Sequence, residues 1–95
     1  MNVNIQSVKF DADKRLLEFV ENKVSKLDRF VERAVSADVI MKLDKDYEKG
    51  NKVVTITVNV PGDELVSEQR SRSFEEATDL CIDALKKQLE RHKNK

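Results

Sequence analysis

The C-terminal stretch, residues 73–95, constrains the fold more than any other part of the chain, because a helix start signal is followed by one long stripe. Ser73 and Glu76 have the spacing of a capping box, in which the serine hydroxyl accepts from the Glu76 amide and the glutamate side chain returns to the Ser73 amide. The residues that then recur at three- and four-residue steps are Phe74, Ala77, Cys81, Ala84, Leu85, Gln88 and Leu89. The pattern predicts one long helix with a single face in the core.

The outward face of this helix changes sign along its length. Its acidic half holds Glu75, Glu76, Asp79 and Asp83, and its basic half holds Lys86, Lys87, Arg91, Lys93 and Lys95. The helix macrodipole alone favours such an order, by about 0.3–1 kcal/mol for each exposed charge. The charge order of this helix alone therefore does not indicate a function. A binding surface would need a second element that places more basic residues beside the basic end of this helix.

An earlier amphipathic helix supplies that element. Asp11 or Asp13 offers an N-cap, and an apolar stripe continues to about Ala34 through Leu16, Leu17, Val20, Val24, Leu27 and Val31. At about 100° per residue the polar positions separate into two rows. The acidic row consists of Glu18, Glu21, Asp28 and Glu32, and the basic row consists of Arg15, Asn22, Lys26, Arg29 and Arg33. Lys23, Phe19 and Phe30 lie between the basic row and the core. Segregated rows gain little from ion pairs within one row. We expect the basic row to meet something anionic, and a solvated face is the alternative.

The remaining segments alternate apolar and polar residues, as strands do. Residues 2–8, 36–43 and 52–60 have this pattern, and Pro61-Gly62 has the composition of a type II turn leading to a weaker strand over residues 64–72. Small side chains there, Ser67 and Ser71 with Gln69 between them, would let a helix approach closely.

The element order β-α-β-β-β-α predicts an α+β domain with a four-stranded sheet and two helices packed on one face. The opposite, outer face is expected to be polar and nearly uncharged, lined by Asn2, Asn4, Thr55, Thr57 and Asn59. Packing both helices on one face would place the basic row of the first and the basic end of the last on one continuous surface.

Composition narrows the classes of function. The 95 residues are 39% apolar, which suits a single domain over residues 1–95, and 18 basic residues balance 18 acidic ones, so anion binding has to come from local patches. The single Cys81 is expected to be buried and suits a reducing cytosol. Without a long apolar run or a leader pattern, we expect a soluble, unprocessed chain with no membrane partner.

No pattern of catalytic chemistry is found in the sequence. Both glycines stand alone in turn segments, so no phosphate loop is predicted. His92 and Cys81 are the only nitrogen and sulfur ligands, and their separation along one helix, about 16 Å, does not suit a metal. We therefore expect no enzyme, no cofactor, no metal and no small-molecule substrate.

Two segments, joined by the element order, resemble a known family. Residues 16–30, LLEFVENKVSKLDRF, and residues 77–93 resemble the short ribosome hibernation-promoting factors, also called ribosome-associated inhibitor A or protein Y. The resemblance implies a cytoplasmic protein that binds the small ribosomal subunit and its rRNA in the decoding region. It would block the mRNA and tRNA sites and inhibit translation in slow growth.

The resemblance also implies which residues bind RNA. The family's basic positions fall on Lys23, Lys26 and Arg29 in the first helix and on Lys87, Arg91 and Lys93 in the last. Arg33 and Lys86 join them from the basic rows. Arg70 and Arg72 on the fourth strand either add RNA contacts or keep an edge strand from aggregating.

The chain also departs from the family pattern. Many relatives have a lysine at the position of Ala84 and an aromatic residue at that of Glu75. Long relatives have an additional C-terminal domain that pairs two ribosomes, so we expect this chain to inactivate single ribosomes or to pair them only with a helper protein. Two other functions stay open: a regulator that docks an acidic protein, and a general double-stranded RNA-binding module.

Overall fold

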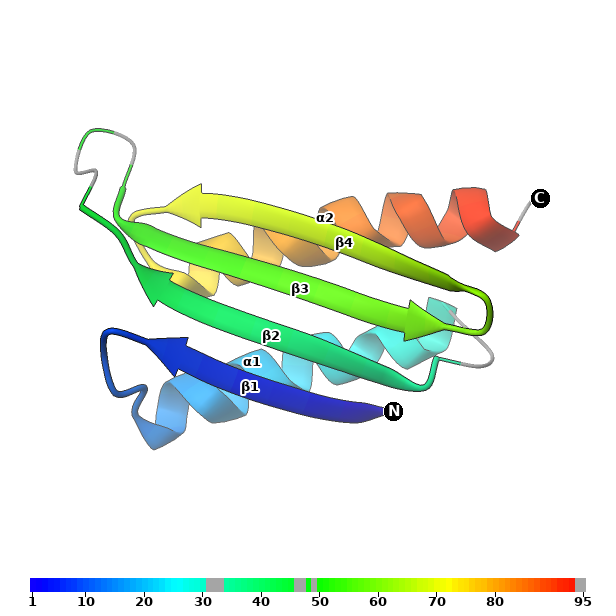
Figure 1. Ribbon diagram of the computed structural model, residues 1–95, viewed down its shortest axis with the longest axis horizontal. Helices are drawn as coiled ribbons and strands as arrows, with labels where there is room; N and C mark the ends of the chain where they lie inside the picture. The colour runs from blue at the N-terminus through cyan, green and yellow to red at the C-terminus, as the bar shows by residue number, and fades with distance from the viewer. Residues whose placement is uncertain (31–33, 46–47, 49, 94–95) are drawn as a thin grey trace.

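The computed structural model describes residues 1–30, 34–45, 48 and 50–93. Along the chain lie β1 (Asn2–Val8), α1 (Lys14–Ser25), the 3-10 helix η1 (Lys26–Phe30), β2 (Ser36–Leu43), β3 (Lys52–Val60), β4 (Asp63–Ser71) and α2 (Phe74–Lys93). The strands form one layer and the helices a second layer behind it (Figure 1). The predicted α+β class and the order β-α-β-β-β-α are confirmed.

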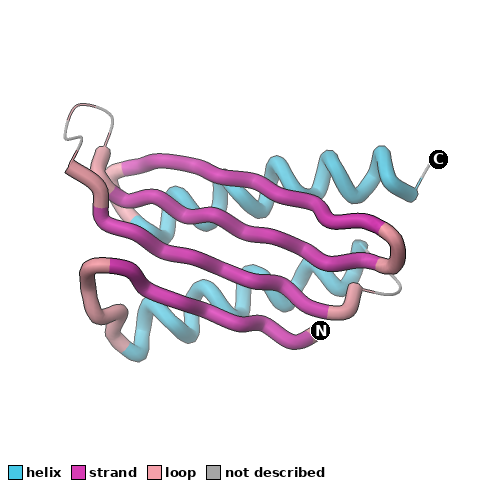
Figure 2. The backbone as a smooth tube through the Cα atoms, viewed as in Figure 1, coloured by secondary structure: helices cyan, strands magenta, loops and turns pink. Residues whose placement is uncertain are grey.

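The four strands lie in the order β1-β2-β3-β4. β1 pairs with β2 in parallel, and the two later pairs, β2 with β3 and β3 with β4, are antiparallel. α1 makes the crossover between the parallel strands, and both helices cover the same face of the sheet (Figure 2). β4 begins and ends one residue earlier than predicted, so Arg72 lies in the turn before α2.

The outer face of the sheet is more charged than predicted. Asp38 of β2 accepts hydrogen bonds from the side-chain amides of Asn4 and Asn59, each at 3.2 Å. Glu68 of β4 accepts from the Thr55 hydroxyl at 2.8 Å. The prediction of a nearly uncharged face is wrong because it considered β1 and β3 and omitted the outward residues of β2, which lies between them, and of β4, which lies at the edge beyond β3.

The first helix begins as predicted and ends differently. The Asp13 side chain caps it by accepting from the Leu16 amide at 2.8 Å. A continuous α-helix to about Ala34 was expected, and that is wrong, because the α-helix stops at Ser25 and tightens into η1. Residues three apart eclipse one another in a 3-10 turn, so Leu27 follows Val24 into the core. Both are fully buried. Val31, Glu32 and Arg33 lie outside the described residues.

α2 begins where the capping box predicted. The Ser73 hydroxyl accepts from the Glu76 amide at 3.1 Å. The predicted stripe contributes Phe74, Ala77, Cys81, Leu85 and Leu89 to the buried core, with Thr78 and Ile82 added beside it. Ala84 and Gln88 lie at its margin, and the Gln88 side-chain amide donates to the Val66 carbonyl of β4 at 2.9 Å.

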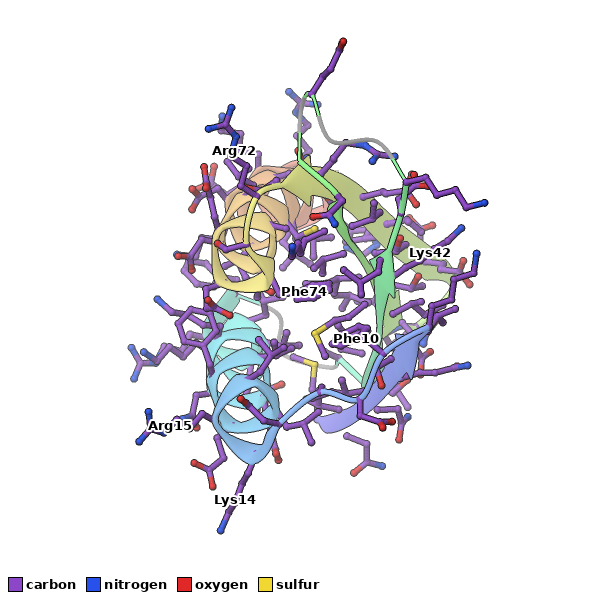
Figure 3. All side chains as sticks on the ribbon, turned by 90° about the vertical axis from the view of Figure 1, so that its left-hand side faces the viewer. Phe10, Lys14, Arg15, Lys42, Arg72 and Phe74 are labelled. Atoms are coloured by element: carbon purple, nitrogen blue, oxygen red, sulfur yellow. The ribbon has the colours of Figure 1, made fainter. Side chains whose placement is uncertain are left out.

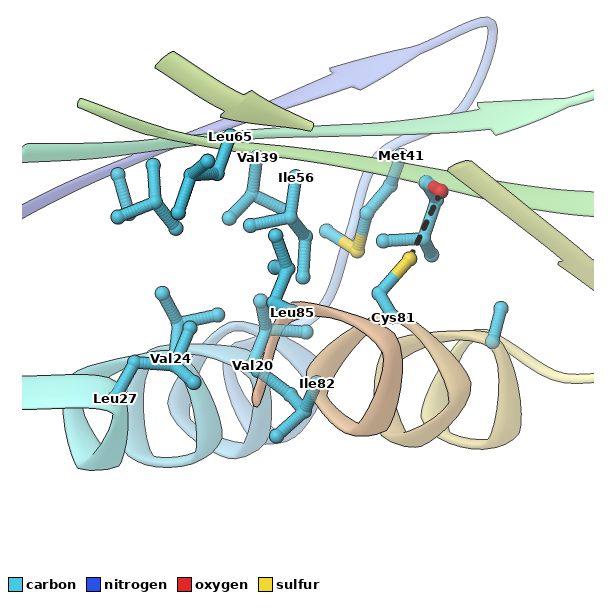
Figure 4. Packing of buried hydrophobic residues seen from close by; sticks show 14 of the residues in the cluster. Val20, Val24, Leu27, Val39, Met41, Ile56, Leu65, Cys81, Ile82 and Leu85 are labelled. Carbon is cyan, nitrogen blue, oxygen red and sulfur yellow. Dashed lines mark hydrogen bonds between the residues drawn. The ribbon is translucent and has the colours of Figure 1, made fainter. Parts of the chain in front are cut away.

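The core fills the space between the two layers. Figure 4 shows Val20, Val24 and Leu27 of the first helix and Leu85 of α2 below the apolar residues of β2 and β3, which include Ile56. Among the predicted small residues of β4, Ser67 and Ser71 are buried. The Cys81 thiol of α2 lies 3.5 Å from the Ser67 carbonyl oxygen, which shows the close approach of the helix to β4. Leu17 was expected in the stripe, yet it is 36% exposed because it lies at the margin of the buried face.

Cys81 gives a first testable prediction. Its thiol is fully buried and donates to the Val54 carbonyl at 3.2 Å (Figure 4), and burial raises its pKa to about 11. The thiolate is the reactive species, so a disulfide reagent at pH 8 should label the native protein slowly and the urea-unfolded protein within seconds to minutes. Labelling at equal rates in both states would contradict the buried position.

Candidate nucleic-acid interface

A groove of about 460 Å³ runs between the first helix and α2. The helices form the layer opposite the outer sheet face, with Arg15 and Arg72 projecting on the helix side and Lys42 on the other (Figure 3). Both helix segments contribute to the lining, which consists of Lys23, Lys26, Arg29, Phe30, Asp79, Ile82, Asp83 and Lys86. The groove thus combines cationic, apolar and acidic side chains.

Its two innermost ammonium groups are held by neighbours. The Lys23 ammonium lies 3.4 Å from the Asp79 carboxylate and 5.5 Å from the centre of the Phe19 ring. The Lys86 ammonium, which belongs to α2, lies 5.3 Å from the centre of the Phe30 ring of η1. Both ring distances are within the range of cation–π attraction. These contacts orient the lysines and leave Lys26 and Arg29 exposed at the rim.

The structure brings four of the predicted site residues together: Lys23, Lys26, Arg29 and Lys86. Lys87 and Arg91 are exposed on α2 and do not line the groove. Lys87 follows Lys86 by one residue, which turns it about 100° around the helix axis. Lys86 is therefore the α2 cation that lines the groove, and the expected contact of Lys87 and Arg91 with RNA stays a prediction.

The other predicted positions fall elsewhere. Arg33 lies outside the described residues, and Lys93 ends α2 with a side chain outside the described part. Arg72 is exposed just before the start of α2, at the opposite end of that helix from Arg91, and it projects outward on the helix side (Figure 3).

Arg70 points to the outer face of the sheet and ties the β2–β3 connection to β4. Its guanidinium pairs with Asp44 and donates to the Gly50 carbonyl at 3.2 Å. The hydrogen bond from Arg70 is the main reason that the pKa of Asp44 lies below its usual value. Arg70 is half-buried in these contacts, so it is not the solvated edge charge that one interpretation assumed.

The acidic row of the first helix turns away from the groove. Asp28 pairs with the N-terminal ammonium group of Met1 at 2.9 Å, which places this row beside the start of β1. Glu18 and Glu21 are exposed, and Glu18 lies 3.9 Å from Lys14. The acids that do line the groove, Asp79 and Asp83, belong to α2.

Sequence reasoning assigned no role to the acidic and apolar residues on the α2 wall. Asp79 and Asp83 were attributed to the charge order of the helix, and Ile82 fell outside the predicted stripe. A signal was present, because Ile82 and Lys86 are four residues apart, as are Asp79 and Asp83. Residues at that spacing share one face of a helix.

Among the described residues, no three His, Cys, Asp or Glu side chains are grouped so that they could hold a metal ion. Within the same part of the chain, no helix is long and apolar enough to cross a membrane.

The fold is shared with ribosome-associated proteins of known structure. The N-terminal domain of Protein Y from Thermus thermophilus is 25% identical, with a TM-score of 0.82 over 97% of this chain and 99% of that one. A ribosomal subunit interface protein from Coxiella burnetii, 21% identical, has the same fold with a TM-score of 0.84 over the full length of both chains. Residues 3–95 match the family described as sigma 54 modulation protein / S30EA ribosomal protein, and the chain belongs to this family.

Ribosome hibernation promoting factors are among its relatives. That of Azotobacter vinelandii is 36% identical over 95 residues, which cover all of this chain and 85% of the relative. That of Salmonella typhimurium is 33% identical over 96% of its length. The Bacillus subtilis factor is also 33% identical, and the chain spans 50% of its length. The resemblance found in the sequence is confirmed, and the role for which these relatives are named, ribosome hibernation, is not an enzymatic one.

Proposed function

We propose that the protein binds the small ribosomal subunit at the rRNA of the decoding region, blocks the mRNA and tRNA sites there, and inhibits translation in slow growth. Such a factor works in the cytoplasm, where ribosomes are. The observation that carries the proposal is the grouping of Lys23, Lys26, Arg29 and Lys86 in one groove of a chain whose net charge is zero.

Electrostatics supports RNA as the partner of this groove. A neutral chain has no bulk attraction for a polyanion, so its affinity depends on where its cations are concentrated. Three cations of the first helix and one of α2 share the groove, while Glu18 and Glu21 are exposed on the acidic row. Lysine supplies point charges to phosphates, and the planar guanidinium of Arg29 can bind two phosphate oxygens at once.

The apolar part of the lining suits RNA that is not fully paired. Phe30, which is 38% exposed, and Ile82, which is 6% exposed, both line the groove. Unpaired bases stack on aromatic side chains, whereas an A-form duplex offers mainly its backbone and 2′-hydroxyls. This favours structured rRNA with exposed bases over a general duplex-binding role.

Residues outside the groove have a secondary part in the proposal. Lys87 and Arg91 are exposed on α2, and they, with Lys93 and Arg33, would contact phosphates around the main contact. Arg72 is exposed at the other end of α2 and would reach RNA only if the footprint covers the whole helix. We assign Arg70 no RNA contact, because it lies on the outer face of the sheet and supports the β2–β3 connection through Asp44 and Gly50.

Salt dependence tests the contact with phosphate. If the four cations neutralise four phosphates, log affinity should fall against log salt with a slope of about −3, since each phosphate on a single strand contributes about 0.7. Between 50 and 200 mM potassium chloride at constant magnesium, affinity for purified small subunits should fall roughly 50-fold. An affinity that stays flat over this range would reject phosphate contact.

Sedimentation of a native lysate through a sucrose gradient tests the partner. The protein should travel with small subunits or whole ribosomes, and recovery only in the free fractions would favour the regulator of an acidic protein. We keep as a proposal that pairing of two ribosomes requires a helper protein, so that the purified chain and ribosomes should give no dimer peak.

A further inference from the structure

The groove contains two carboxylates that attraction to RNA does not explain. Asp79 and Asp83 lie on the α2 wall, among the cations Lys23, Lys26, Arg29 and Lys86. Asp79 lies 3.4 Å from the Lys23 ammonium, and the Asp79 side chain is 51% exposed. A phosphate that approaches Lys23 must therefore displace an internal counter-ion.

Helix stability accounts poorly for these two acids. The acids of the first turn are Glu75 and Glu76, so Asp79 and Asp83 lie beyond the region where the macrodipole favours negative charge. Like charges four residues apart on a helix disfavour each other. Core packing does not need them either, because both residues are exposed.

The consequence for binding depends on what the RNA presents. Every RNA carries hydrogen-bond donors, namely 2′-hydroxyl groups and N–H groups of bases, which carboxylates accept. Folded RNA holds these donors at fixed positions relative to its phosphates. A flexible strand such as poly(U) does not, so each phosphate that it places in the groove meets the repulsion of two carboxylates. A carboxylate beside a cation therefore weakens the binding of an RNA that presents only a phosphate there. It does not weaken the binding of an RNA that also places a hydrogen-bond donor at the carboxylate.

We propose that Asp79 and Asp83 are specificity-determining residues of the groove, which reject generic polyanions and accept structured RNA that presents donors to them. The inference rests on the proposed function and deepens it. It assigns phosphate to the four cations of the groove, with Lys26 and Arg29 exposed at the rim, and hydroxyl or amino groups to the two carboxylates of α2.

The test uses the full chain with Asp79→Asn and Asp83→Asn combined, because asparagine keeps the shape and the acceptor oxygen. Affinity is measured for poly(U) and for purified small subunits in the same buffer. Each carboxylate removed should raise poly(U) affinity roughly threefold, the effect of one charge at about 6 Å in water. The double variant should bind poly(U) about tenfold more tightly, as the product of those two steps. Its affinity for small subunits should change less than threefold, so the preference for subunits falls.

The matched control removes the same charge from the acidic row. Glu18→Gln with Glu21→Gln leaves the groove untouched, and salt screens charges beyond about 8 Å at physiological ionic strength. Because of this screening, the affinity of the control variant for poly(U) should change by less than about twofold. An equal rise in this control would overturn the inference, since net charge alone would explain it.

Two other results would overturn the proposal: an unchanged affinity of the groove variant for poly(U), or an equal gain for poly(U) and for subunits. Failure of the wild-type chain to bind small subunits would count against the proposed function instead. In that case a tenfold gain for poly(U) in the groove variant alone would still support rejection of phosphate by Asp79 and Asp83.

Discussion

Replacing Lys26 and Arg29 together by glutamate is expected to weaken binding to small ribosomal subunits at least 100-fold. Both side chains are exposed at the rim of the groove, so each reversal removes a phosphate contact and adds a repulsion. A loss of about 1.4 kcal/mol at each position, tenfold in affinity, gives the combined effect. A pelleting assay with purified subunits measures it.

The fold should survive this change, because surface substitutions usually stay within about 0.5 kcal/mol in free energy of unfolding. A thermal melt of each variant separates lost binding from lost structure. A melting temperature that falls sharply in Lys26→Glu/Arg29→Glu would show that these residues support the fold, and the binding loss would then carry no weight.

Two further variants locate the surface. Lys87→Glu with Arg91→Glu makes the same change of charge outside the groove, and we expect a weaker but measurable loss of binding. Glu18→Gln with Glu21→Gln should leave binding unchanged or raise it slightly through the more positive field. If the acidic-row variant lost binding while both basic variants kept it, with all melts unchanged, the surface would lie on the other side of the first helix.

Local signals in the sequence were sufficient for most of the fold. Ser73 and Glu76 marked the start of α2, and the strands β1, β2 and β3 followed from alternation alone. These features are set by neighbours within about four residues, so no tertiary knowledge was needed. The small residues of β4 also predicted the close approach of α2, because a helix can lie over Ser67 and Ser71 only where side chains are short.

The candidate site could be predicted less completely, because it depends on how two helices are turned against each other. Lys23, Lys26 and Arg29 were placed on one side by the helical period, and the structure does bring them together. The choice between Lys86 and Lys87 depends on a turn of about 100°, which the direction of the α2 core face decides. That direction is fixed by tertiary contacts with β3 and β4, which no local pattern in the helix itself reveals.

Long-range contacts also decided the positions that sequence reasoning misjudged. The pairing of Arg70 with Asp44 joins residues 26 positions apart, and nothing local to either residue announces it. The end of α1 at Ser25 also had no local signal, because Leu27 continues the apolar stripe of Val20 and Val24 and is buried in η1 as it would be in a regular α-helix.

Gly50→Ala is expected to destabilise the domain by about 3 kcal/mol, the largest stability effect we predict for a single added methyl group. Gly50 has a φ of 97°, and an added Cβ would lie 2.2 Å from the carbonyl oxygen of Ser71. The positive φ costs an alanine about 1–2 kcal/mol. The clash adds to this cost because Ser71 is backbone at the end of β4 and cannot rotate away, so the contact with Arg70 would shift as well.

Gly62 provides the matched control for this prediction. It also has a positive φ, 77°, but an added Cβ there meets no atom within 4 Å. Gly62→Ala should therefore show the conformational cost alone, about 1 kcal/mol or roughly 5 °C in melting temperature, while Gly50→Ala should lower it by about 15 °C. Since the two variants differ mainly in the contact with Ser71, equal melting temperatures would mean that the β2–β3 connection does not pack against the end of β4. A difference of the expected size would instead identify Gly50 as the point where that connection is held to the sheet.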